Sequence, residues 1–156
     1  MKLNRLALIS AVALVALLAG AIAFNALAPP QELKLKVKWR PPNYMLGNPA
    51  PDPWIAEIFF APSRPLEQID PNTLLLEGIY SPSGTPYLLR SSPDRMAVPF
   101  DGDDVLRALL TKAPHLAPGE YRILLQITGN LKPEYGATPF SGDGGINLIV
   151  PDVPPP

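Results

Sequence analysis

The stretch that decides the fold class is residues 119–150, "GEYRILLQITGNLKPEYGATPFSGDGGINLIV". In its first part apolar residues recur at every second position, which is typical of a strand with one buried face. The residues expected on that face are Tyr121, Ile123, Leu125 and Ile127. A second apolar run at 146–150 predicts another strand, so we expect 124–129 and 146–150 to pair as terminal strands. The Gly, Pro and Asp residues between them are then expected to form a long reversing turn.

Farther upstream, residues 32–40 give the clearest strand in the sequence, because apolar and basic side chains alternate strictly. The basic residues are Lys34, Lys36, Lys38 and Arg40. We expect this basic stripe on a solvent-facing surface, where Lys side chains protect a strand edge from unwanted pairing. The alternative is contact with an anionic lipid surface.

The remaining segments predict short strands and one helix. The expected strands are 54–60, 73–80, 87–90 and 96–100. Residues 41–53 are rich in Pro, Gly and Asn and predict a loop or an irregular edge. Residues 101–112 predict a short helix with Asp101 or Asp103 as its N-cap. This pattern indicates a mainly β fold, specifically an antiparallel immunoglobulin-like β-sandwich with one short helix.

The composition excludes several classes of function. The chain has 156 residues, of which 22 are Pro and none is Cys, and its net charge is -1. A net charge this close to zero gives no electrostatic indication that the protein binds nucleic acid. The lack of Cys removes disulfides, thiol nucleophiles and Cys-based zinc sites. We expect one folded domain over 29–150, followed by a Pro-rich tail at 151–156.

The N-terminal segment, residues 1–28, predicts a signal peptide or a transmembrane anchor. Lys2 and Arg5 precede an uncharged run at 6–24, which is long enough to span a bilayer core. Cleavage after Ala23 and retention as an anchor both fit this segment. The basic residues at 34–40 oppose a simple positive-inside count, yet we expect the domain outside the cytoplasm, either membrane-anchored or secreted.

Three segments resemble a known kind of module. They are "IDPNTLLLEG" at 69–78, "VPFDGDDVLRALL" at 98–110 and the stretch at 119–150. Over 69–150 the chain resembles exported bacterial and archaeal immunoglobulin-like accessory modules, of the type found beside dockerin-like or sorting segments. It departs from that pattern where Pro133 and Tyr135 enlarge the usual short turn. The resemblance implies a β-sandwich outside the cytoplasm, and it brings no catalytic residues.

No sequence motif indicates catalysis. His115 is the only His and lies between two loop residues, without a nucleophile motif nearby, so we expect it at the surface. Nucleophile elbows, phosphate-binding loops and dinucleotide fingerprints are absent from the sequence. We therefore expect the protein not to be an enzyme.

Four acidic residues are candidate ligands for Ca²⁺, and they are Asp101, Asp103, Asp104 and Asp143. Carboxylate oxygens suit this hard cation, provided that several of them converge. The competing interpretation is that the first three cap the helix and the fourth belongs to a turn. No cofactor other than Ca²⁺ is indicated.

Aromatic side chains are the candidate contacts for a sugar or a protein partner. They are Trp39, Trp54, Tyr44, Tyr80, Tyr87 and Tyr135. Trp39 and Trp54 lie in strand patterns and are expected in the core, whereas Tyr44 and Tyr135 lie in polar loops and are expected to contact a partner.

Together these features predict a non-catalytic, membrane-anchored or secreted β-sandwich that docks onto other proteins. Its expected role is that of an accessory or structural subunit in an envelope or membrane assembly. The alternative is an adhesion module that binds calcium or carbohydrate.

Overall fold

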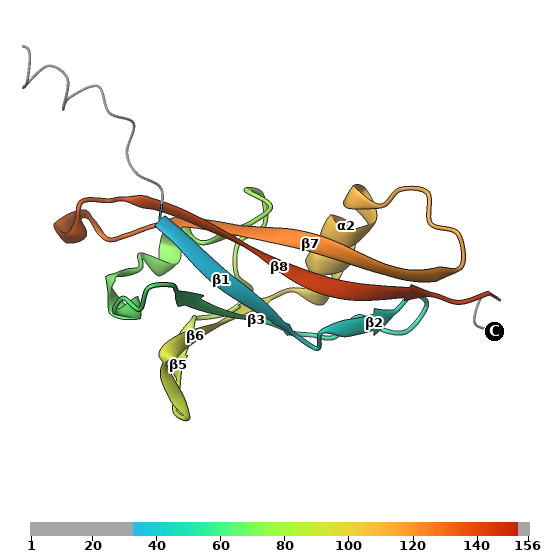
Figure 1. The fold of residues 1–156 in the computed structure, drawn as a ribbon, viewed down its shortest axis with the longest axis horizontal. Coiled ribbons are helices and arrows are strands. Elements are labelled where there is room, and N and C mark those ends of the chain that lie inside the picture. The colour runs from blue at the N-terminus through green and yellow to red at the C-terminus, as the bar shows by residue number, and fades with distance from the viewer. Residues whose placement is uncertain (1–32, 153–156) are drawn as a thin grey trace, which may run out of the picture. The chain divides into compact units, whose positions relative to one another are not determined.

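The strands and the helix that form from this sequence are visible in a computed structural model, which describes residues 33–152 (Figure 1). Within that range the chain is mainly β with one α-helix, as predicted. The elements are β1 (Leu33–Arg40), β2 (Asn43–Met45), β3 (Trp54–Phe60), β4 (Leu75–Leu76), β5 (Tyr87–Leu89), β6 (Ser92–Phe100), α2 (Gly102–Lys112), β7 (Gly119–Asn130) and β8 (Pro139–Val150).

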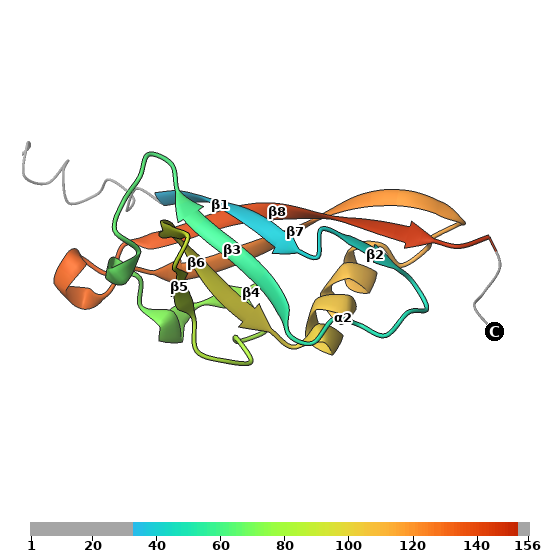
Figure 2. The same cartoon turned by 90° about the horizontal axis from the view of Figure 1, so that it is seen from below.

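The strands form one mixed sheet in the order β4-β7-β8-β1-β3-β6-β5, and β2 also pairs with β8. β1 begins parallel to β8 at Leu33 and Lys34, and from Leu35 to Arg40 it pairs antiparallel with β3. The sheet therefore curls, and the β7–β8 ribbon faces the β3–β6 pair across the core (Figure 1, Figure 2). The prediction that all strands pair antiparallel is wrong, because β1 and β2 both run parallel to β8.

The glycine-rich run of β8 is strand, so the prediction of a long turn there is wrong. β7 and β8 pair without interruption from Gly119↔Val150 to Asn130↔Pro139, and the turn is confined to 131–138. The reason is the close approach of β1. A Cβ on Gly142 would lie 2.2 Å from the carbonyl oxygen of Leu35. Glycine is required here because another backbone passes too near for any side chain.

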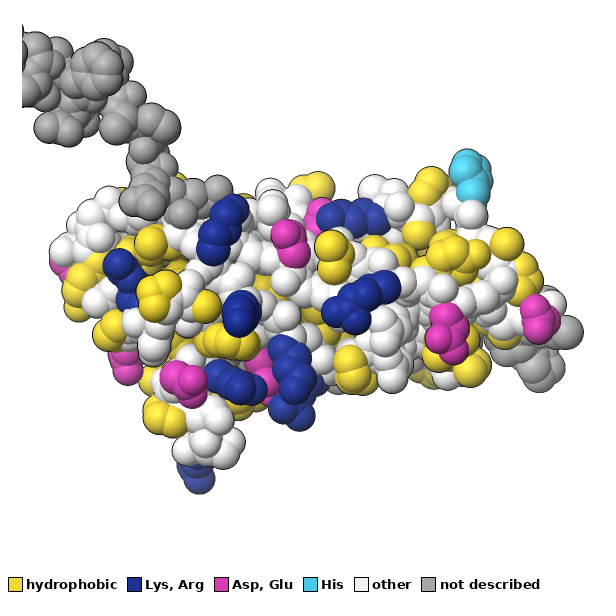
Figure 3. All heavy atoms as spheres, in the orientation of Figure 1, with side chains coloured by type: hydrophobic (Ala, Val, Ile, Leu, Met, Phe, Trp, Pro, Cys, Tyr) yellow, Lys and Arg dark blue, Asp and Glu magenta, His cyan; other side chains and the backbone are white. Residues whose placement is uncertain are grey.

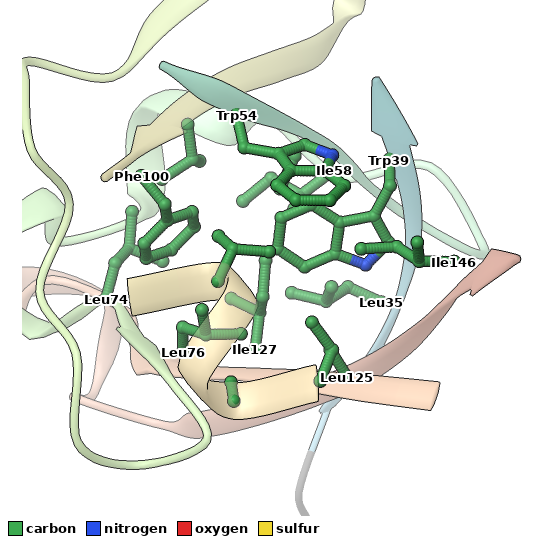
Figure 4. Close-up of a cluster of buried hydrophobic side chains, with 14 of the residues drawn as sticks. Leu35, Trp39, Trp54, Ile58, Leu74, Leu76, Phe100, Leu125, Ile127 and Ile146 are labelled. Carbon is green, nitrogen blue, oxygen red and sulfur yellow. The ribbon is translucent and has the colours of Figure 1, made fainter. Parts of the chain in front are cut away.

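The core lies inside the curl, and both Trp residues are in it, as predicted. Trp39 and Trp54 are 1% and 0% exposed, and the ring centroid of Trp39 lies 6.0 Å from that of Phe100. Figure 4 shows these rings in one cluster with aliphatic side chains from β7 and β8. The indole Nε1 of Trp39 donates to the carbonyl oxygen of Gly144 at 3.1 Å. The indole Nε1 of Trp54 likewise donates to the carbonyl oxygen of Pro41 at 3.0 Å, so both buried indoles are hydrogen-bonded.

The helix forms where the sequence predicts it. The carboxylate of Asp101 accepts hydrogen bonds from the backbone N–H groups of Asp103 and Asp104, at 2.9 and 3.3 Å, so Asp101 is the N-cap. Val105 and Leu109 are buried against the core, while most of the helix's polar residues face outward.

The prediction of a strand over 73–80 is wrong. The segment expected to form a strand at 73–80 contains only the two residues of β4, because Glu77 and Gly78 adopt positive φ angles that turn the chain. The segment 41–53, expected to be a loop or an irregular edge, is irregular apart from the three residues of β2, which pair with β8.

The N-terminal segment predicted as a signal peptide or anchor lies outside the described residues, as does the tail beyond Asp152. Within residues 33–152, no helix is both long enough and apolar enough to cross a bilayer.

Candidate functional site

The outer face of β1, β3 and β6 is basic. The strict alternation of β1 buries Leu35 and Trp39 and turns its Lys and Arg side chains to the opposite face. Figure 3 shows Lys and Arg side chains gathered over β1 and β3. The registers Lys36↔Phe59, Lys38↔Glu57 and Arg40↔Ile55 place the β3 residues among them.

One carboxylate lies buried in this face. Glu57 is only 3% exposed, although it is on the side of β3 that faces away from the core. The guanidinium Nε of Arg40 contacts its Oε1, and the Nη1 of Arg95 lies 3.5 Å from its Oε2. Arg95 also lies over the ring of Phe59, with its guanidinium carbon 5.1 Å from the ring centroid. Two cations thus surround one anion.

This cluster leaves two buried polar atoms without hydrogen-bond partners, the Oε2 of Glu57 and the Nε of Arg95. The ion pair between Arg95 and Oε2 is a charge contact that lacks hydrogen-bond geometry. An unsatisfied buried donor or acceptor costs about 1–3 kcal/mol. Among the polar side chains of residues 33–152, these two atoms are the ones for which that cost is not offset.

Both orphaned side chains line a pocket of about 320 Å³. The lining residues are Arg40, Ile55, Glu57, Tyr87, Leu89, Ser91, Ser92 and Arg95. The pocket is open to solvent between β3 and the β5–β6 hairpin, and its walls combine aliphatic carbons, three hydroxyl groups and a formal charge of about +1 from two Arg and one Glu. The two orphaned atoms are themselves buried, so the pocket presents the other parts of the Glu57 and Arg95 side chains.

A second hollow, of about 470 Å³, is lined by Pro71, Asn72 and the residues 81–86. Its walls are Pro, Ser, Thr, Gly and Asn residues, without a charged group.

The two tyrosines that were predicted to contact a partner differ in exposure. Tyr44 is 5% exposed, its ring lies 5.3 Å from that of Trp54, and its hydroxyl donates to the carbonyl oxygen of Asn48. The prediction that Tyr44 is an exposed loop residue is wrong, because the pairing of β2 with β8 draws it into the core. Tyr135 is 46% exposed in the 3-10 turn Pro133–Tyr135, where it is available for contact.

Burial raises the pKa of Tyr44 above its usual value of 10.0, and the nearby carboxylate of Asp103 raises it further. Both effects disfavour the phenolate, the first by removing water and the second by charge repulsion. Tyr44 is therefore a structural side chain.

Of the four candidate calcium ligands, three lie at the start of α2, where Asp103 is exposed in the first turn, and the fourth lies on β8. Asp101 caps α2, and the carboxylate of Asp104 pairs with Arg107 at 3.0 Å. Asp143 lies exposed on β8, where its cross-strand neighbour is Gln126. Within 33–152 the structure gathers no group of three or more His, Asp or Glu side chains suited to a metal ion.

Other residues considered from the sequence lie at the surface or in side-chain pairs. His115 is exposed between α2 and β7. The ring of Tyr80 faces the guanidinium of Arg107 at 6.0 Å. Tyr87 is 52% exposed and lines the pocket, so one of the six aromatic residues considered from the sequence belongs to the site.

Sequence reasoning missed Glu57 itself. The signal was present, because Glu57 is the only charged residue in the apolar run "WIAEIFF" at 54–60. A lone charge inside a buried strand requires a partner and is uncommon without a structural or functional reason. The partners Arg40 and Arg95 lie far from it in sequence.

No protein-family model matches this chain, and no curated protein or solved structure matches it either.

Proposed function

We propose that this protein is a non-catalytic docking module that binds another protein as an accessory subunit of an envelope or membrane assembly. In this proposal residues 1–28 direct export and either anchor the chain or are removed, so that the β domain lies outside the cytoplasm. The resemblance over 69–150 to exported immunoglobulin-like modules supports this location and the immunoglobulin-like assignment of the curled sheet.

The observation that carries the proposal is the basic outer face with its open pocket. Two of the cationic side chains on this face, Arg40 and Arg95, pair with the carboxylate of Glu57, and Lys36 and Lys38 lie on the same face of β1. Ile55, Phe59 and Tyr87 supply partly exposed apolar surface among them. Arg and aromatic side chains around a solvent-accessible pocket are typical of protein interfaces.

The charge of the face defines the partner. Its excess of positive charge favours a protein whose contact surface is acidic around the part that enters the pocket. Charges at the edge of an interface mainly steer association and suppress wrong partners, and added salt weakens their effect.

The experiment is extraction of the full-length protein from its native membranes in mild detergent, followed by identification of what co-purifies. We expect one partner protein whose association weakens as salt is raised. The double variant Lys36→Glu/Lys38→Glu should lose this partner. The matched control Lys132→Glu reverses a charge on the β7–β8 turn instead and should keep it.

Three results would contradict the proposal. The first is that the protein runs alone and free of membrane. The second is that the partner still binds the double variant. The third is that the control variant loses the partner to the same extent. A rise in melting temperature with millimolar Ca²⁺ would instead support the adhesion alternative.

A further inference from the structure

The geometry points to a further interaction surface, the outer edge of β7 over residues 118–124, and to a second copy of this chain as its partner. The two β7 strands pair antiparallel about a two-fold axis, so that the same edge of each copy contacts the other. This inference goes beyond the proposed function, because it uses a different part of the sheet from the basic outer face.

β7 has strands on both sides only near its end. β8 pairs with its whole length on one side, whereas β4 pairs on the other side only with Ile127 and Thr128. Among residues 33–152 no strand pairs with this other side of 119–125, and Figure 1 shows no strand except β8 next to that part of β7. The first half of β7 is therefore a free edge of the sheet.

Hydrogen bonds farther along β7 show which of its backbone groups point to this edge. The carbonyl oxygen of Gln126 accepts from the backbone N–H of Glu77 at 2.9 Å. The carbonyl oxygen of Leu124 accepts from the Nζ of Lys112 at 2.9 Å. Both donors lie on the side away from β8. Because backbone groups alternate in direction along a strand, the even-numbered residues of β7 direct theirs outward.

Glu120 and Arg122 continue this series into the free edge. Both residues are exposed, and within 33–152 their outward N–H and C=O groups have no hydrogen-bond partner. The carbonyl oxygen of Ala117 accepts from the hydroxyl of Tyr121, whose side chain packs against the core, at 2.9 Å. The connection from α2 to β7 is therefore held on the core side of the strand. Exposed backbone groups of this kind are a template for another strand.

The charges of the edge select one register. When Glu120 of one copy lies opposite Arg122 of the second copy, the two-fold axis forms the reverse pair as well, and each pair exchanges both of its N–H···O bonds. The neighbouring registers place Glu120 opposite Glu120 or Arg122 opposite Arg122, which brings like charges together.

Both side chains are available for these pairs. Within the described part of the chain neither Glu120 nor Arg122 has an ion-pair partner. The guanidinium of Arg122 lies over Gly145, where an added Cβ would come 2.7 Å from its Nε, and a glycine offers it no anion. The second copy supplies the missing carboxylate.

The ends of the pairing match in the same register. The residue opposite Leu124 is Pro118, which has no N–H to donate. The carbonyl oxygen of Leu124 does not need that donor, because it already accepts from Lys112. Pro118 and Lys112 thus limit the pairing to a short segment, as Pro and Lys do at other sheet edges.

The first test measures the mass of the full-length protein in detergent by size-exclusion chromatography with light scattering. We expect a monomer–dimer equilibrium that depends on protein concentration. Glu120→Arg and Arg122→Glu each place like charges in both pairs, so each should weaken the dimer about tenfold or more. The double variant Glu120→Arg/Arg122→Glu restores opposite charges and should restore the dimer, which also shows that the single variants do not act through misfolding.

The matched control is Glu134→Arg, which makes the same change of charge in the turn between β7 and β8 and should leave the dimer unchanged.

The second test traps the register with a disulfide, which is practical because the chain has no Cys. Two full-length proteins are mixed, one carrying Glu120→Cys and the other Arg122→Cys. Opposite residues of a hydrogen-bonded pair have Cα atoms about 5.5 Å apart, which is within the range of a disulfide. We expect oxidation to link the two different proteins in preference to two copies of either one.

Three results would overturn the inference. They are a monomer at every concentration, a dimer that Glu120→Arg and Arg122→Glu leave intact, and disulfides that form within one variant instead of between the two. None of these results bears on the docking partner, which is tested by Lys36→Glu/Lys38→Glu, so each proposal can fail without the other.

Discussion

The two faces of the β1–β3 strand pair differ in whether their buried polar atoms are hydrogen-bonded. On the inner face the indole of Trp39 is buried and donates to Gly144, so its one polar atom is satisfied. On the outer face Glu57 is almost as deeply buried, yet its Oε2 has no hydrogen bond. Both faces belong to the same strands, and they are separated only by the alternation of side chains.

This difference separates what stabilises the fold from what is left for binding. The inner face is closed by close packing and a complete hydrogen bond, which is typical of a structural core. The outer face retains a buried donor and a buried acceptor without hydrogen bonds, next to a charge pair and an open pocket. The comparison leads to three predictions about stability, from the largest effect to the smallest.

Gly142→Ala should have the largest effect on stability, because it would disrupt the packing of β8 against β1. The new Cβ would lie 2.2 Å from the carbonyl oxygen of Leu35, a backbone atom that cannot move without disturbing the β1–β8 pairing. We expect the free energy of unfolding to fall by about 3 kcal/mol, the upper part of the range for overpacking. Urea unfolding followed by circular dichroism measures it.

The control is Gly84→Ala, whose Cβ would meet only the side chain of Pro99 at 3.2 Å. It should lose less than about 1 kcal/mol, as surface substitutions usually do. Equal effects of the two substitutions would show that the close approach of β1 to β8 does not restrict position 142.

Tyr44→Phe should have an intermediate effect. It removes the hydrogen bond to Asn48, which is worth about 1 kcal/mol near neutral pH. The folded-state pKa of Tyr44 is raised above 10.0, so its contribution is fully present below pH 10.0 and is lost as the pH rises through the folded-state value. The wild-type protein should therefore lose stability more steeply than the variant above pH 10.

Unfolding curves of both proteins between pH 8 and pH 11 test this difference. Tyr135→Phe is the matched control, because Tyr135 is exposed in a turn, and it should follow the wild-type curve. Parallel curves for wild type and Tyr44→Phe would contradict the effect of burial on the Tyr44 hydroxyl.

Glu57→Met should have the smallest effect on stability, although Glu57 is the most buried charged residue of the outer face. The side chains of Arg40 and Arg95 are 58% and 34% exposed, so water can solvate them once the carboxylate is gone. Replacing a buried ion pair by an apolar side chain is often neutral or stabilising. We expect the free energy of unfolding to stay the same or to rise by about 1 kcal/mol, measured by urea unfolding.

Glu77→Met provides the contrast, because the Oε1 of Glu77 has both a hydrogen bond and an ion pair. It accepts from the backbone N–H of Gln126 at 2.6 Å and pairs with Lys112 at 2.8 Å. Removing it should cost about 1–2 kcal/mol. A larger loss for Glu57→Met than for Glu77→Met would assign Glu57 a structural role and contradict the distinction between the two faces.

Much of the local structure could be predicted from the sequence. The alternation in β1 and β7 identified both strands and their buried faces, and the two Trp residues were assigned to the core. The helix and its N-cap Asp101 followed from a local capping signal. Each of these features depends on residues that lie close together along the chain.

The candidate site could not be predicted in the same way. Glu57 was conspicuous as a single charge in an apolar run, but its partners come from β1 and β6, and the pocket also needs the β5–β6 hairpin. Tyr44 was assigned to the surface because its neighbours are turn-forming residues, yet the parallel pairing of β2 with β8 buries it.

The sequence by itself determined the mainly β class, the helix, the inner faces of the long strands and the basic character of the outer face of β1. Only the tertiary structure decided that the glycines of β8 belong to a strand, that Tyr44 is buried, and that Glu57 faces a pocket. The physical reason is that hydrophobic period and capping are local, whereas close approach, burial and unsatisfied polar atoms depend on which distant strands pass beside one another.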